Sequence, residues 1–274
     1  MTSSCIVERE NDILIVTLNR PEKHNSLDLT MHTALERIWN DFYADEVLRV
    51  AILTGAGDKA FCAGSDMSMF GTSELEALGG IPANINPHGY AGLTRRFDAS
   101  KPIIAAVNGY CLGGGFEVML CCDLAVASEN ASFGLPEVRL GGAAMGGGIP
   151  RLARKLPFTR AMTLLLTGER IGAAQALEWG LVTEVTPARE VLAVAKDLAR
   201  KIALGGPFGV QVSMNIMNAM LHGDAMDEVL RYEDEKLTRM VLDCEDSKEG
   251  FAAFFEKRAP KWRSPRKLSP LPPR

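Results

Sequence analysis

Two glutamates stand beside unusual turns in the sequence, and their residue type could carry proton transfer. Glu117 lies in "CLGGGFEVML", two residues after three consecutive glycines, and Glu137 lies in "FGLPEVRLG". Burial in an apolar loop raises the pKa of a carboxyl towards a value useful in acid–base chemistry. Each has an ordinary alternative, since Glu117 could simply complement a helix dipole and Glu137 could be solvated. Neither glutamate alone decides the chemistry.

Two glycine-containing turns could bind an anion through backbone N–H groups. Glycine costs about 1 kcal/mol relative to alanine inside a helix, so the run before Glu117 needs a compensating role. A helix starting near Gly114 would present unpaired N–H groups that only glycine lets a ligand approach closely. Small residues also surround Ser65 in "AFCAGSDM", where the Ser65 N–H could face an oxyanion. Tight helix packing and a plain turn remain the alternatives for the two sites.

Motifs of other chemistries are missing from the sequence. "GGAAMG" has the glycine spacing of a phosphate-binding loop but continues with glycine rather than Lys-Ser/Thr, and no G-x-S-x-G elbow occurs. The four histidines are dispersed, and the six cysteines include no C-x-x-C spacing. We therefore expect free thiols, no metal site and no covalent nucleophile.

Short apolar runs alternate with helical patterns through the first two thirds of the chain. Alternation within "ILIVTLNRP" predicts a strand, and the preceding "END" predicts a hairpin turn. Apolar residues at helical spacing predict a helix from Asp28. "RVAILTG", "KPIIAAVNG" and "DLAVAS" read as buried strands, the last of them after the helix that the glycines open. This order predicts an α/β protein built from repeated ββα or βα units.

Helical patterns dominate the last third of the chain. We place the boundaries of an α/β core at 1–200, of a helical region at 201–262 and of a flexible tail, rich in proline and basic residues, at 263–274. The final helical pattern, "SKEGFAAFFEKR", puts three phenylalanines on one face, Phe251, Phe254 and Phe255. We expect that face to be buried against the body of the protein or a neighbouring subunit.

The composition is that of a soluble globular protein. The 274 residues are 47% hydrophobic and carry a formal charge of −4, which gives no basic field for nucleic acid. The sequence has no apolar run long enough for a membrane span and no targeting signature at its start. We expect a cytoplasmic protein with no nucleic-acid or membrane partner.

Several co-linear motifs resemble the crotonase, or enoyl-CoA hydratase/isomerase, superfamily. They run in the family order from about residue 6 to 262 and comprise "LNRPEKHNSL", "VAILTGAGDKAFCAGSDM", "KPIIAAVNGYCLGGGFE", "ASFGLPEVRLG", "LTGERIGAAQALEWGLV" and "SKEGFAAFFEKR". The resemblance implies an α/β crotonase spiral of ββα units followed by a helical C-terminal trimerisation region. It also implies a homotrimer or a homohexamer made as a dimer of trimers.

The resemblance assigns roles to the residues singled out above. The backbone N–H groups of Ser65 and Gly114 would form an oxyanion hole for a thioester enolate, Glu117 would activate water for attack at C3, and Glu137 would give a proton to C2. The implied activity is that of an enoyl-CoA hydratase, a hydro-lyase that adds water syn to a 2-enoyl-CoA thioester. Coenzyme A would be part of the substrate, with no separate cofactor. The coenzyme A site implied by the resemblance comprises Lys23, His24, Ala63, Ser65, Asp66 and Met67, with Lys257 reaching the phosphates from a neighbouring subunit.

Departures from the family pattern leave the substrate open. Ser65 stands where many hydratases have alanine, and "GGAAMGGGIPRL" replaces their usual Pro-Gly-x-Gly-Gly loop beside the acyl pocket. A Δ3,Δ2-enoyl-CoA isomerase and a carnitinyl-CoA dehydratase are the alternatives within the superfamily. A non-catalytic interaction or RNA-binding protein of the same fold is the alternative from another class. Acyl length and head group are not determined by the sequence.

Overall fold

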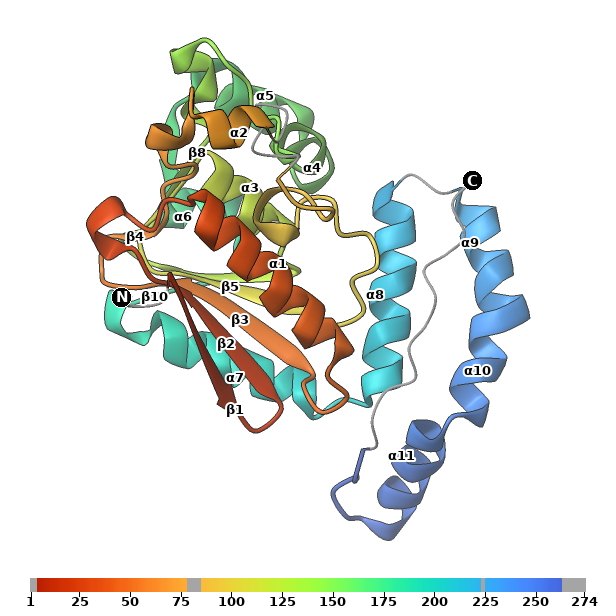
Figure 1. Ribbon diagram of the computed structural model, residues 1–274. Coiled ribbons are helices and arrows are strands. Elements are labelled where there is room, and N and C mark those ends of the chain that lie inside the picture. The colour runs from red at the N-terminus through yellow and green to blue at the C-terminus, as the bar shows by residue number, and fades with distance from the viewer. Residues whose placement is uncertain (1–3, 78–84, 223–224, 263–274) are drawn as a thin grey trace.

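The computed structural model describes residues 4–77, 85–222 and 225–262, and its first two thirds form the expected α/β core (Figure 1). The strands are β1 (Cys5–Glu10), β2 (Ile13–Leu18), β3 (Val50–Gly55), β4 (Ala60–Cys62), β5 (Ile103–Val107), β6 (Tyr110–Leu112), β7 (Leu124–Ser128), β8 (Ser132–Gly134), β9 (Arg170–Gly172) and β10 (Glu184–Thr186). The helices are α1 (Leu29–Ala44), α2 (Ser73–Ala77), α3 (Gly114–Cys121), α4 (Gly148–Lys155), α5 (Phe158–Thr167), α6 (Ala173–Glu178), α7 (Val191–Ala203), α8 (Pro207–His222), α9 (Met226–Tyr232), α10 (Thr238–Asp243) and α11 (Glu245–Glu256).

The strands form two sheets, and three successive strand pairs contribute to both. The larger sheet has the order β1-β2-β3-β5-β7-β10 and the smaller sheet has the order β4-β6-β8-β9. β3 and β4, β5 and β6, and β7 and β8 each give one strand to each sheet, and the successive units pair in parallel. The predicted ββα repeat is therefore confirmed, and α3 is the helix that follows the second of these pairs.

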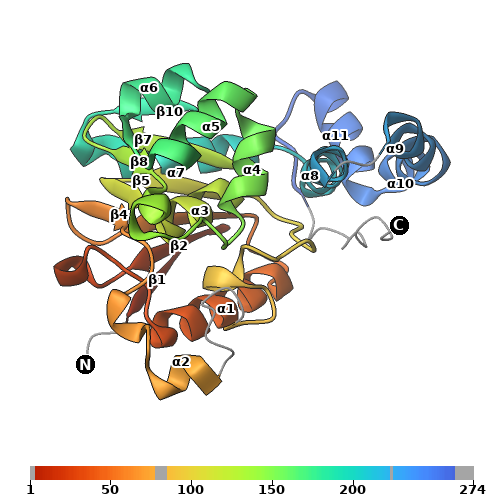
Figure 2. The same ribbon diagram turned by 90° about the horizontal axis from the view of Figure 1, so that it is seen from above.

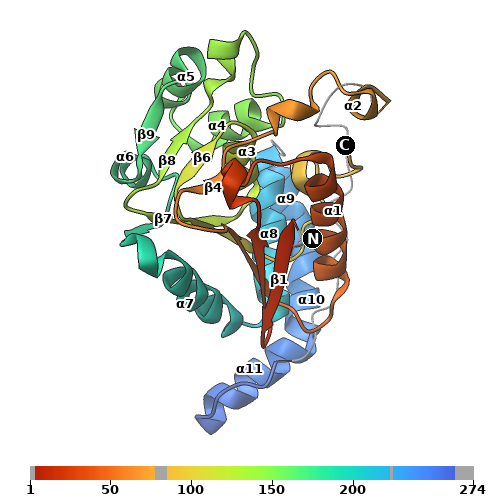
Figure 3. The ribbon, with the colours of Figure 1, turned by 60° about the vertical axis from the view of Figure 1, so that its left-hand side comes forward.

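Alternating side chains of the larger sheet face two separate apolar layers. Ile15 and Ile52 pack with Ala195 of α7 on one face. Val16 and Leu53 belong to the cluster that contains the buried side chains of α1 on the other face. Figure 3 shows the sheet between α7 and α1. The continuous apolar runs read from the sequence thus reflect strands buried on both sides.

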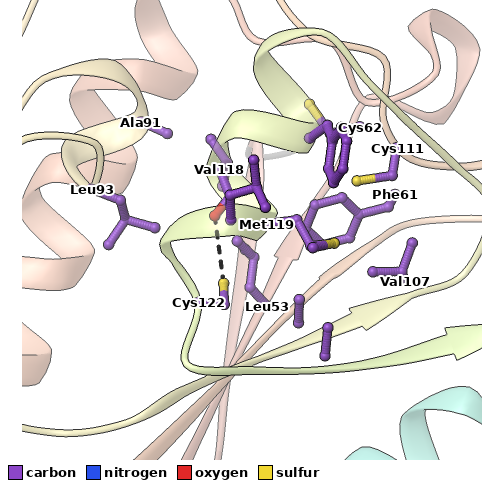
Figure 4. Close-up of a cluster of buried hydrophobic side chains, with 14 of the residues drawn as sticks. Leu53, Phe61, Cys62, Ala91, Leu93, Val107, Cys111, Val118, Met119 and Cys122 are labelled. Atoms are coloured by element: carbon purple, nitrogen blue, oxygen red, sulfur yellow. Dashed lines mark hydrogen bonds between the residues drawn. The ribbon is translucent and has the colours of Figure 1, made fainter. Parts of the chain in front are cut away.

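Helix α3 lies within the main apolar cluster rather than at the surface. Seven of its residues, from Gly114 to Leu120, are buried. Figure 4 shows Val118 and Met119 packed among Leu53, Phe61 and Val107, with the Cys122 thiol donating to the Val118 carbonyl. All six cysteines are free, as expected. The first turn of α3 is therefore fixed in position by packing around the whole helix.

The C-terminal helices α8 to α11 lie to one side of the sheets in both Figure 1 and Figure 2. A π-helical turn, Glu233–Leu237, joins α9 to α10. The side chains of Phe251, Phe254 and Phe255 are 60%, 77% and 77% exposed, so the described part of the chain does not bury this face, and its burial by a neighbouring subunit stays a prediction. The predicted tail, 263–274, lies outside the described residues. Among the residues that are described, no helix is long and apolar enough to cross a bilayer.

Candidate active site

Three segments of the candidate site follow three neighbouring parallel strands of the smaller sheet. The Ala63–Ser65 turn follows β4, Gly113 and Gly114 follow β6, and Glu137 lies three residues beyond β8. Because β4, β6 and β8 pair in parallel, their carboxyl ends lie at one edge of the sheet. The Gly113 N–H donates to the Gly134 carbonyl at 2.9 Å, which ties two of these segments together. Segments more than 70 residues apart in the sequence are thus brought to one place.

Each of the three consecutive glycines is needed because a neighbouring group occupies the space of a side chain. A Cβ at Gly115 would lie 2.2 Å from the Cys62 carbonyl oxygen, and one at Gly114 would lie 2.5 Å from the Tyr90 hydroxyl oxygen. Gly113 has a φ of 54° in the left-handed region and lies beside the Glu137 carboxyl. The glycines therefore let α3 begin in direct contact with β4, with Tyr90 and with Glu137.

Two backbone N–H groups at this edge have no acceptor. Gly114 is the first residue of α3, and no hydrogen bond from its N–H occurs within the described part of the chain. The Leu27 N–H donates to the Gly64 carbonyl, and the Leu27 carbonyl accepts from the Asp66 N–H. Because these two bonds flank Ser65, the N–H of Ser65 points away from Leu27, and it is likewise unpaired among the described residues. The two turns touch, since a Cβ at Gly64 would lie 3.1 Å from the Gly114 nitrogen. This pair of donors can hold one anionic oxygen.

The Glu117 carboxyl is buried beside these donors. Its side chain is on α3, is 4% exposed, and accepts a hydrogen bond from the Gly148 N–H at 2.8 Å. Burial raises its pKa to about 7, and the nearby charge of Glu137 pushes the pKa in the same direction. A carboxyl with such a pKa can exchange protons at neutral pH.

Glu137 supplies a second carboxyl from the 3₁₀ turn Pro136–Leu140. An ideal Cβ on Gly113 would lie 3.1 Å from its Oε1 atom. Within the described residues its Oε2 atom is buried and has no hydrogen-bond partner. Burial raises the pKa of this carboxyl as well. The predicted pair of acids is thus brought to the same strand ends, with a free oxygen on one of them.

The sequence reading missed two groups at this site. Tyr90 lies in a 3₁₀ turn, Tyr90–Gly92, and its hydroxyl is 3.1 Å from the Ser65 hydroxyl. Gly148 begins α4 and supplies the N–H that Glu117 accepts. Neither lies in a segment with a usable periodicity. No pattern in the sequence indicated that either of them meets α3.

Most of the predicted coenzyme A-binding residues gather beside the Ala63–Ser65 turn. The His24 carbonyl accepts from the Ala63 N–H at 3.0 Å, and Lys23 and His24 are exposed. Met67 is 66% exposed. Asp66 has a different environment, since it forms a 2.7 Å ion pair with Arg20 and its pKa is lowered to about 2, chiefly by hydrogen bonds from Ser68 and Arg20. Asp66 therefore holds the turn in shape within this chain.

Lys257 is not brought to the site within one chain. It ends α11 in a left-handed conformation, with a φ of 51°. In Figure 3, α11 lies well away from α2, α4 and α5. Only a neighbouring subunit could bring such a residue to this site.

Known proteins resemble this chain over nearly its whole length. A family model described as enoyl-CoA hydratase/isomerase matches residues 8–265. A mevalonyl-coenzyme A hydratase of Aspergillus fumigatus is 44% identical over 93% of this chain and 93% of its own. A carnitinyl-CoA dehydratase of Proteus mirabilis is 39% identical over 96% of this chain and 99% of its own. The crystal structure of an enoyl-CoA hydratase from Mycobacterium tuberculosis superposes with a TM-score of 0.86 at 38% identity, covering 95% of this chain and 98% of that one. The α/β fold with parallel sheets, the helical C-terminal region and these matches over the whole length together show that the chain belongs to the enoyl-CoA hydratase/isomerase, or crotonase, family of hydro-lyases and related enzymes.

Proposed function

We propose that the protein adds water to 2-enoyl-CoA thioesters, and removes it in the reverse direction, at the site formed by α3 and the three strand ends. The observation that carries this proposal is the convergence of two unpaired backbone donors with two carboxyls, buried Glu117 and half-buried Glu137, whose pKa values are raised. Acyl-CoA hydration needs both features, because negative charge develops on the thioester oxygen while protons move at C2 and C3. Relatives named as hydratases and dehydratases support the same reaction class.

In the proposed reaction the water molecule is the nucleophile. Ionised Glu117 takes a proton from the water molecule while the oxygen of that water forms a bond to C3. The electron pair of the C2–C3 double bond moves onto the thioester oxygen, which accepts hydrogen bonds from the N–H groups of Ser65 and Gly114. Protonated Glu137 then gives its proton to C2 as the carbonyl re-forms. Repulsion between the carboxylates favours one proton on the pair. The steps require this proton to lie on Glu137, with Glu117 ionised, when water attacks. Both acids acting from one face would make the addition syn.

The coenzyme A moiety is proposed to lie along the surface that carries Lys23, His24, Ala63 and Met67. This surface runs directly into the oxyanion turn at Ser65. Lys257 would reach the phosphates from an adjacent copy, which requires the proposed homotrimer or homohexamer. The exposed phenylalanine face of α11 supports such an assembly, since large apolar side chains there have no cover within the described chain.

The test is turnover of purified protein on a panel of 2-enoyl-CoA esters, followed by loss of the enoyl-thioester absorbance. The panel should include unbranched, hydroxylated and quaternary-ammonium acyl groups, because relatives carry the names mevalonyl-CoA hydratase and carnitinyl-CoA dehydratase. Glu117→Gln and Glu137→Gln should each lower kcat by about 10²–10⁴, since each amide keeps the shape but cannot transfer the proton. Glu129→Gln, at an exposed position, is the matched control and should leave kcat unchanged.

Two outcomes would replace this proposal. Turnover of a 3-enoyl-CoA to its 2-enoyl isomer that survives Glu117→Gln but not Glu137→Gln, in a protein that adds no water, would assign an isomerase. Binding of acyl-CoA without any turnover would assign a non-catalytic member of the family.

A further inference from the structure

Tyr90 is the buried side chain that contacts both turns of the donor pair. Its hydroxyl lies 3.1 Å from the Ser65 hydroxyl. A Cβ at Gly114 would lie 2.5 Å from the Tyr90 hydroxyl oxygen and 2.6 Å from Cζ, so the phenol lies directly against the Gly114 backbone. The residue is 2% exposed. One phenol thus connects the two residues whose N–H groups are unpaired.

The Tyr90 phenol is a neutral hydroxyl in this setting. Burial above all raises its pKa well above the ordinary range, and the charges of Glu117 and Glu137 act in the same direction. The phenol therefore contacts the Ser65 and Gly114 turns as an uncharged group.

Helix α1 holds Tyr90 in place through the next residue. Ala91 has a φ of 54°, a left-handed conformation that costs an alanine about 1–3 kcal/mol. Its N–H donates to His32 Nδ1 at 3.0 Å, and its carbonyl accepts from Trp39 Nε1 at 3.1 Å. The His32 ring also packs edge-on against the Tyr90 ring at 4.4 Å. Two buried side chains of α1 thus hold the strained turn in place, and this turn fixes the position of Tyr90.

We propose that Tyr90 is a positioning residue of the oxyanion hole, its ring setting the Gly114 amide and its hydroxyl setting the Ser65 turn. This inference rests on the proposed function for the role of the hole, but it concerns how the hole is held together. Ser65 is the matching half, because its hydroxyl is bonded to Tyr90 while its backbone N–H is the donor. Ser65→Ala would keep the backbone N–H donor and lose the hydrogen bond to the Tyr90 hydroxyl, which we call the tether.

The first arm of the test separates the tether from the packing. Tyr90→Phe and Ser65→Ala remove the same hydrogen bond from opposite sides, so each should lower kcat by about tenfold. KM should change by less than about twofold, because the tether acts on the transition-state oxygen. The double variant should be no worse than either single one, since one shared bond is lost. Tyr90→Leu also removes the ring from Gly114 and should lower kcat by about 100-fold or more.

The second arm does not depend on turnover. 4-Dimethylaminocinnamoyl-CoA absorbs at longer wavelength when its thioester oxygen accepts strong hydrogen bonds, so its red shift on binding reports the hole directly. Wild type should give a large red shift, Tyr90→Phe a smaller one and Tyr90→Leu little or none. Tyr43→Phe, which removes another buried phenol hydroxyl of the core, is the control and should keep the wild-type shift. Circular dichroism and light scattering should show that each variant is folded and assembled as wild type.

The outcomes distinguish this inference from the proposed function. A folded Tyr90→Leu protein that keeps the wild-type red shift would overturn the positioning role, whatever its kcat. A wild-type protein that red-shifts the absorbance of the bound chromophore but hydrates no enoyl-CoA would overturn the proposed reaction. The red shifts of the Tyr90 variants would then still decide the positioning role. Absence of any red shift in wild type would overturn both.

Discussion

Replacing Glu117 with glutamine is expected to stabilise the folded protein at pH 8.5 while it removes activity. The carboxyl is 4% exposed, and burial raises its pKa from an ordinary 4.5 to about 7. At about 1.36 kcal/mol per pKa unit, this difference corresponds to about 3.4 kcal/mol that the ionised carboxylate costs the folded state. Glutamine carries no charge and does not incur this cost.

The sign depends on pH. A carboxyl whose pKa is raised on folding is ionised more easily in the unfolded chain, so stability is greatest below pH 4.5 and falls as pH rises to 7. The full cost is present only above pH 7. At pH 5 the same linkage gives only about 0.8 kcal/mol.

One opposing contribution must be subtracted. Glutamine Oε1 can still accept from the Gly148 N–H, but the carboxylate also accepts from Gly146, where the amide NH₂ of glutamine cannot. Losing that bond costs about 1 kcal/mol. The net gain is therefore about 2.4 kcal/mol at pH 8.5 and close to zero at pH 5.

Thermal unfolding by circular dichroism at fixed protein concentration measures this difference. For a chain of this size the gain corresponds to roughly 5–10 °C in Tm at pH 8.5, with little change at pH 5. Glu129→Gln should show no pH-dependent change, because that side chain is exposed. A Glu117→Gln protein that melts below wild type by the same amount at both pH values would refute the reasoning, because burial of a charge would then not be the cause.

Three further predictions test other parts of the structure. The kcat/KM for hydration should fall about tenfold per pH unit below an apparent pKa near 7, because Glu117 must be ionised, and a pH-independent rate between pH 5 and 7 would contradict that role. Gly115→Ala should destabilise the protein by at least about 2 kcal/mol in denaturant titration, because its Cβ would lie 2.2 Å from the Cys62 carbonyl oxygen. The control Gly209→Ala, in α8 with open space around the new Cβ, should stabilise the protein by up to about 1 kcal/mol. Phe254→Ser should shift the assembled species towards monomer in light scattering, because that side chain is 77% exposed in the single chain; an unchanged trimer or hexamer would exclude this residue from the interface.

The elements with strong local patterns were the ones that the sequence predicted. The hairpin around Asn11, the helix predicted from Asp28 and the start of α3 at Gly114 all occur, since turn, helix and glycine preferences act over a few residues. Strand β9, between α5 and α6, was missed because three residues give no usable alternation.

The candidate site was predictable only in part. Motifs located the acids and donors, because each lies within a few residues of a recognisable turn. Tyr90 and Gly148 reach the site from 25 residues beyond Ser65 and 31 residues beyond Glu117, through contacts that only the folded chain creates. The phenylalanine face of α11 could be identified but not placed, because none of the residues that the structure describes covers it.

The use of main-chain rather than side-chain donors divides the site into parts that mutation can reach and parts that it cannot. The N–H groups at Ser65 and Gly114 persist under every substitution except proline, and their spacing is set by the parallel register that pairs Cys62 of β4 with Cys111 of β6. A slip of one residue in that register would move Gly114 by about 3.3 Å. Under the proposed function, substitutions in the 141–147 loop would therefore change the acyl group that is accepted while the two N–H groups stay in place. Related proteins could therefore differ in substrate preference while the same two backbone N–H groups remain in place.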